Sequence, residues 1–217
     1  MSFSNSSLVT YKNISKNKTT NRNHAIDTIT IHCYCGQVTA KQGCDYFATT
    51  GRECSANYVV GCDGSIGLSV DEKDRSWCSA NSENDNRAIT IEVASESVEP
   101  YSVTEAAYNS LVKLVVDICR RNGIKKLLWK NDKSLIGKTD KQNMTVHRWF
   151  ANKSCPGTYL MNKMGEIASL VNSSLNEQNT TLYRVQVGAF SIYENAVKLR
   201  HELKSKGYDC FIVEGKK

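Results

Sequence analysis

The segment 104–122 carries the clearest periodic pattern in the 217-residue chain. Four apolar side chains recur there at the spacing of one helix face, namely Leu111, Leu114, Val115 and Ile118. Thr104 is a suitable N-cap and Gly123 a suitable stop, so the sequence predicts a long amphipathic helix. Such a helix needs a partner for its apolar stripe, which indicates a layered globular fold.

Short apolar runs elsewhere predict strands at 26–33, 57–61, 65–68, 88–94 and 126–129. Asp63 and Gly64 separate the second and third runs and favour a tight hairpin. Further helices are expected at 39–47 and 156–171, where Pro156 suits the first helical turn. Strands that alternate with helices predict an α/β fold with a central mixed β-sheet flanked by helices.

Changes in composition divide the chain into four parts. Residues 1–25 are polar and basic and are expected to form an N-terminal arm. Residues 26–172 hold most of the predicted strands and helices and form the main domain. Residues 173–181 are rich in Ser, Asn and Thr, which is typical of a linker. Residues 182–217 follow a strand–helix–strand pattern and predict a small βαβ unit that is too short to bury a good core alone.

Composition and charge narrow the functional classes. No run approaches the roughly 20 apolar residues that span a bilayer, so membrane insertion is not expected. The N-terminus lacks the basic and then apolar order of a signal peptide, which favours a cytoplasmic location and reduced thiols for the nine cysteines. The net charge of +6 is mild and its basic residues are scattered. Without a nucleic-acid-binding motif, nucleic acid is not an expected partner.

His147 and Cys155 lie eight residues apart in a stretch that opens the last predicted helix of the main domain. Cys155 directly precedes Pro156, so it would sit at a helix N-terminus, where the helix dipole favours a thiolate. His32 ends the first predicted strand and offers a second imidazole. Two imidazoles and one thiolate suit zinc and leave one coordination position open for water. The spacing alone leaves a metal site and ordinary structural roles equally open.

The chain from about residue 26 to residue 171 resembles the zinc-dependent N-acetylmuramoyl-L-alanine amidases of the type-2 amidase and peptidoglycan-recognition-protein family. The matching segments occur in the family's order: Thr30–His32, Ser55–Val60, Asp63–Gly64, Arg75–Trp77, Asn86–Glu92, Val146–Arg148 and Lys153–Gly157. The general appearance is most similar to amidases of phages and prophages of Gram-positive hosts. The resemblance implies hydrolysis of the amide between N-acetylmuramic acid and L-alanine in bacterial peptidoglycan.

The resemblance also implies roles for single residues. The implied Zn²⁺ ligands are His32, His147 and Cys155. Lys153 matches a basic catalytic residue that would stabilise the negative oxygen of the tetrahedral intermediate. Tyr58 and Glu92 both match residues that handle the proton in some members, and the sequence leaves open which one acts. Trp77 and Asn86 are expected to contact the substrate.

The last 36 residues, 182–217, resemble the first half of a SPOR domain, a module that binds peptidoglycan. Only one βαβ half is present, so pairing of two chains into a homodimer is one expectation for this segment. The absent signal peptide favours a lysin that is held in the cytoplasm until it is released onto the wall.

Two rival functions stay open at this point. One is a non-catalytic peptidoglycan-binding module, which the presence of Cys155 and Lys153 disfavours. The other is a cysteine peptidase with Cys155 as the nucleophile and His147 as the base.

Overall fold

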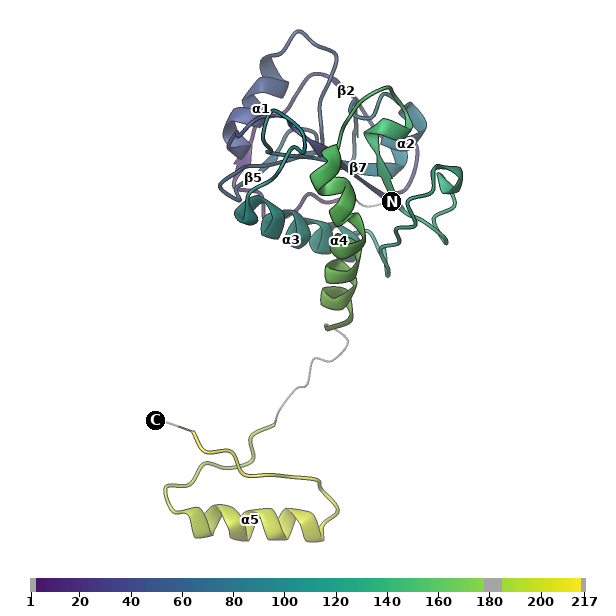
Figure 1. Cartoon of the computed structure of the whole chain (residues 1–217). Helices are drawn as coiled ribbons and strands as arrows, with labels where there is room; N and C mark the ends of the chain where they lie inside the picture. The colour runs from purple at the N-terminus through teal and green to yellow at the C-terminus, as the bar shows by residue number, and fades with distance from the viewer. Residues whose placement is uncertain (1–2, 178–184, 216–217) are drawn as a thin grey trace. The chain divides into compact units, whose positions relative to one another are not determined.

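The computed structural model of the chain describes residues 3–177 and 185–215 (Figure 1). The chain divides into two units, Met1–Asn179 and Thr180–Lys217. Within the described residues, no helix combines the length and the apolar character needed to span a bilayer.

A six-stranded mixed sheet forms the centre of the first unit. Its strands, in spatial order, are β1 (Tyr11–Lys12), β5 (Ile66–Leu68), β4 (Tyr58–Val60), β7 (Ala88–Val93), β3 (Thr28–Cys33) and β8 (Met144–Val146). β4 and β5 are antiparallel, as the predicted hairpin requires, and Gly64 in their turn has a φ of 81°, which favours glycine. The three strands at the other end, β7, β3 and β8, are parallel. The predicted α/β fold with a mixed sheet is confirmed.

Helices cover both faces of the sheet. They are α1 (Ala40–Thr49), α2 (Ser82–Arg87), α3 (Glu105–Arg121) and α4 (Gly157–Glu177), with 3-10 turns η1 (Lys133–Leu135) and η2 (His147–Trp149). Thr104 caps α3 by accepting a hydrogen bond from the backbone of Ala107. The α3 stripe and the inner face of α4 pack with the sheet into one large apolar core, and the two helices lie side by side in Figure 1.

Strand β3 divides its side chains between two buried environments. Ile29 and Ile31 enter the core under α3 and α4. Thr30 points to the opposite face, where its hydroxyl accepts a hydrogen bond from the Asn84 amide of α2. Because side chains alternate along a strand, His32 also points to the α2 face, and it is 0% exposed. The sheet thus has one apolar face and one face that carries polar groups.

The predicted N-terminal arm is packed into the first unit. β1 extends the sheet beside β5, and β2 (Lys18–Thr19) pairs with β6 (Arg75–Ser76). Arg22 is only 6% exposed. Its guanidinium donates hydrogen bonds to the carbonyl oxygens of Glu72, Asp74, Asp85, Asn86 and Ala88. Two-residue strands carry no periodicity, which is why the sequence did not predict them.

Three other expectations differ in detail. Residues 126–129 are not a strand, and α4 continues through residues 173–177 of the predicted linker. In the second unit, α5 (Tyr193–Ser205) is the predicted helix. The described residues 185–190 and 208–213 on its two sides form no strand, while residues 178–184 lie outside the described part.

Candidate metal centre and active site

The register of two parallel strands, β3 and β7, places the first two residues of the site beside each other. His32 on β3 and Glu92 on β7 are paired Cα neighbours, so both side chains project from the α2 face. Val59 on β4 is the Cα neighbour of Glu92 on its other side. Oε1 of Glu92 lies 4.0 Å from Nδ1 of His32.

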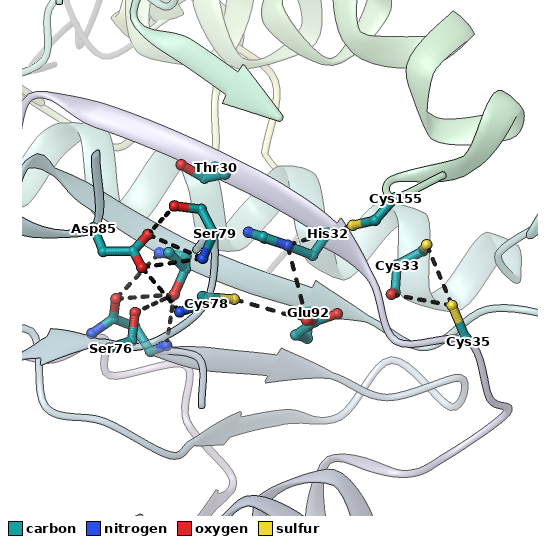
Figure 2. A network of polar contacts seen from close by, with 12 residues as sticks. Thr30, His32, Cys33, Cys35, Ser76, Cys78, Ser79, Asp85, Glu92 and Cys155 are labelled. Carbon is teal, nitrogen blue, oxygen red and sulfur yellow. Dashed lines mark hydrogen bonds and ion pairs between the residues drawn. The ribbon is translucent and has the colours of Figure 1, made fainter. Parts of the chain in front are cut away.

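The other two predicted ligands come from the segment that joins β8 to α4. β8 pairs with β3, with Val146 opposite Ile31, so His147 follows directly beside His32. The centroids of the two imidazole rings are 5.1 Å apart. Cys155 directly precedes Pro156 and the start of α4. Its Sγ lies 3.4 Å from Nδ1 of His32 (Figure 2). One ligand atom from each of the three residues lies within 4.8 Å of the others.

This donor set fits a zinc ion. Two ligands at ordinary Zn–S and Zn–N distances in a tetrahedral site are about 3.5 Å apart, close to the 3.4 Å between Sγ and Nδ1. Burial, with a smaller effect of His147, lowers the pKa of His32 to about 3. The His147 pKa is also lowered, by burial and then by the charge of Lys153. Both rings are therefore neutral near pH 7 and keep a lone pair for a metal.

Glu92 adds a carboxyl group beside the three donors. Burial raises its pKa to about 8. Its Oε1 accepts a hydrogen bond from the Cys78 thiol at 3.8 Å. Its Oε2 is buried and, among the described residues, has no hydrogen-bond partner. A carboxyl group with a pKa near neutrality and a free oxygen can take up and release a proton under physiological conditions.

The remaining predicted site residues are Lys153, Trp77 and Asn86. Lys153 is exposed and stands close enough to His147 to influence its pKa. Trp77 is partly buried, and its indole N–H donates to Thr19 at 3.0 Å. Asn86 lies on α2 and lines a cavity of about 410 Å³ that also contacts Thr145 and Phe150.

The structure does not bring Tyr58 to this site. Tyr58 pairs in register with Ile91, one residue away from the Val59–Glu92 pair, so its side chain points to the opposite, apolar face. It is 0% exposed, donates to Glu72 at 2.6 Å and accepts from the Ser6 backbone at 2.9 Å. The expectation that Tyr58 handles the proton is corrected, because the sheet separates its hydroxyl from the metal donors.

Sequence reasoning missed a polar network that leads to Glu92. Figure 2 shows Asp85 bound to Cys78 and Ser79, and Cys78 bound to Glu92. Cys78 also belongs to a second group of possible metal donors, with His32 and Glu92. The sequence signal was a carboxylate, Asp85, six residues after a serine in a loop, which is too common a pattern to be noticed alone.

Solved structures of similar fold include a hydrolase and an endolysin amidase. The Staphylococcus aureus hydrolase AmiA, solved with its ligand, has a TM-score of 0.55 at 14% identity, covering 78% of this chain and 84% of AmiA. An AmpD derivative has a TM-score of 0.54 at 17% identity, covering 73% and 93%. The endolysin amidase LysCS of Clostridium intestinale URNW has a TM-score of 0.51 at 14% identity, also covering 73% and 93%. These similarities establish the fold. No curated protein matches the sequence.

The sheet and the cluster of imidazole, thiol and carboxyl groups define a hydrolase of the amidase type. The N-acetylmuramoyl-L-alanine amidase model, Amidase_2, matches residues 22–158, which is more than half of the chain. The chain belongs to this family, and its substrate is peptidoglycan. A SPOR domain model matches residues 162–214. The first part of that match lies in α4, which packs on α3 in the first unit.

Proposed function

We propose that this amidase is zinc-dependent and that His32, His147 and Cys155 hold the ion. The observation that carries the proposal is the convergence of three donor atoms within 4.8 Å of one another, from two strand ends and a helix start. When bound there, zinc supplies a Lewis acid that lowers the pKa of water to about 7 and polarises the amide carbonyl.

Glu92 and Lys153 have separate roles in this proposal. Glu92 accepts the proton of the attacking water at its carboxylate and returns it to the departing alanine nitrogen. Its raised pKa supports both halves of that transfer. The Lys153 ammonium, which is exposed on the same loop as Cys155, stabilises the negative oxygen of the tetrahedral intermediate.

Digestion of purified peptidoglycan tests this function. Mass spectrometry of the products should find new L-alanine amino termini and N-acetylmuramic acid with a free lactyl carboxyl group. A chelator should stop the release, and added Zn²⁺ should restore it. A chelated enzyme that continues to cut would exclude the metal role, and cleavage within the stem peptide would favour the rival cysteine peptidase.

We propose further that the second unit binds peptidoglycan and pairs with a second copy. The SPOR match supports the binding. Pairing is supported by α5, which has no buried residue, and by Val185, Phe211 and Val213, which are 84%, 71% and 65% exposed. Light scattering on the full chain and on a version that ends at Glu177 tests the pairing. A dimer only for the full chain is expected, and two monomers would contradict it.

We also infer that the enzyme acts on the wall after release from the cytoplasm, as a phage or prophage lysin of a Gram-positive host. The sequence resemblance to such lysins supports this role. Co-expression with a membrane-permeabilising protein should be required for lysis of the producing cell. Lysis without permeabilisation would contradict the role.

A further inference from the structure

The carboxyl group of Glu92 has one hydrogen-bond donor among the residues that the structure describes. That donor is the thiol of Cys78, 3.8 Å from Oε1. The other oxygen, Oε2, is buried and unpartnered within the same residues. Oε1 also lies 4.0 Å from Nδ1 of His32. A glutamate side chain has several rotatable bonds, so the contacts at this one oxygen influence which way the carboxyl group turns.

Cys78 is itself held in place by a buried carboxylate. Its backbone N–H donates to Oδ2 of Asp85 at 3.0 Å. The next residue, Ser79, donates to the same carboxylate through its backbone at 3.1 Å and through its hydroxyl at 2.5 Å. Asp85 is 1% exposed, so these charge-assisted bonds are shielded from water and fix the loop after β6.

The same network is anchored to the strands that carry the metal donors. Asn84, the neighbour of Asp85 on α2, donates to the hydroxyls of Ser79 and Thr30 at 3.1 and 3.0 Å. It accepts from Thr145 on β8 at 2.8 Å. Thr30 precedes His32 by two residues, and Thr145 precedes His147 by two. The loop that holds Cys78 is therefore in a fixed position relative to both imidazoles.

We propose that Cys78 is a positioning residue for Glu92: its thiol, fixed by the Asp85 clamp on the loop backbone, directs the Glu92 carboxyl group toward the metal donors. The inference rests on the proposed proton-transfer role of Glu92. Cys78 is not one of the three proposed zinc ligands, and in this arrangement it acts through Glu92. Its contact restricts the orientations of the Glu92 carboxyl group before that group accepts a proton from water.

Kinetics of the zinc-loaded full chain on soluble muropeptide test the proposal with two substitutions at one position. Cys78→Ala removes the donor and should lower kcat roughly tenfold, with KM changed less than about twofold. Zinc content should stay at one ion per chain. Cys78→Ser keeps a hydrogen-bond donor and should recover a clear part of the lost kcat. Cys54→Ala removes another partly buried thiol that makes no bond to Glu92, and it should leave kcat unchanged.

The outcomes separate this inference from the proposed function. An unchanged kcat in Cys78→Ala overturns the positioning role. An equal loss in the Ala and Ser variants, or a loss that follows a lower Tm, also overturns it, because the thiol would then act only through packing. A loss that follows lost zinc overturns it too, because Cys78 would then support metal binding. If Glu92→Gln keeps the full kcat, the proton-transfer role of Glu92 is wrong. An inactive Glu92→Gln beside a fully active Cys78→Ala overturns only the present inference.

Discussion

His32, a proposed metal ligand, and Glu92, the proposed proton-transfer residue, lie side by side in the parallel pairing of β3 and β7. Neighbouring strands are about 4.8 Å apart, so their backbone hydrogen bonds set the separation of the two groups before any side chain turns. His147 and Cys155, by contrast, come from the irregular segment after β8. The sheet therefore positions His32 and Glu92, and the segment between β8 and α4 positions His147 and Cys155.

Lys153→Ala should keep the bound zinc and lose most of its turnover. Removal of one group that stabilises a developing oxyanion lowers kcat about 100-fold or more. The measurement is kcat together with metal content. Lys138→Ala, which removes another exposed ammonium, is the matched control and should stay active. Zinc loss in Lys153→Ala would show that the lysine supports the ligands instead.

Tyr58→Phe should lower stability and leave kcat unchanged. The hydroxyl bonds to Glu72 and to the Ser6 backbone, and its removal leaves both buried partners short of one bond. The expected loss is about 1–3 kcal/mol in the free energy of unfolding, measured by urea denaturation. A large fall in kcat with unchanged stability would restore Tyr58 as a candidate for proton transfer.

The stability of the metal-free protein should fall between pH 5 and pH 8 because of Glu92. Its pKa is about 8 when folded and 4.5 ordinarily, so the folded state binds the proton more tightly. Its contribution is complete below about pH 4.5 and is lost as the pH rises through about 8. Tm should be measured across this range for the wild type and for Glu92→Gln in a chelator. The difference in Tm between the wild type and Glu92→Gln should change with pH. A difference in Tm that is constant with pH would contradict the shifted pKa of Glu92.

Arg22→Met should strongly destabilise the first unit. The substitution leaves a set of buried carbonyl oxygens without their donor, and it releases the arm from the loop after β5. We expect a loss of about 3 kcal/mol or more. Arg52→Met changes an exposed arginine and should have little effect. Equal stabilities of the two variants would mean that the arm is not clamped.

The sequence contained enough to predict the α/β fold, and the family resemblance named His32, His147 and Cys155, which the structure brings together. Long periodic segments such as 104–122 predict their own secondary structure. The spacing of His147 and Cys155 alone left a metal site and structural roles equally open. Tyr58 and Glu92 could not be separated, because the face that each side chain takes depends on the register between strands, and a shift of one residue would exchange the two.

The Asp85 network and the arm were hidden for a different reason. Asp85 contacts Cys78 and Ser79 through backbone groups, and Arg22 binds carbonyl oxygens. Main-chain groups are the same for every residue type, so such contacts leave no pattern in the order of side chains.

The wide separation of His32 and Cys155 along the chain, 123 residues, has a consequence for how this enzyme matures. An ion shared by the two residues would close a loop of that length, and closing long loops restricts the unfolded chain most. During synthesis, the first donor is made more than a hundred residues before the last. An ion could then bind both residues only after almost the whole first unit has been made, so hydrolytic activity would appear only once that unit has folded.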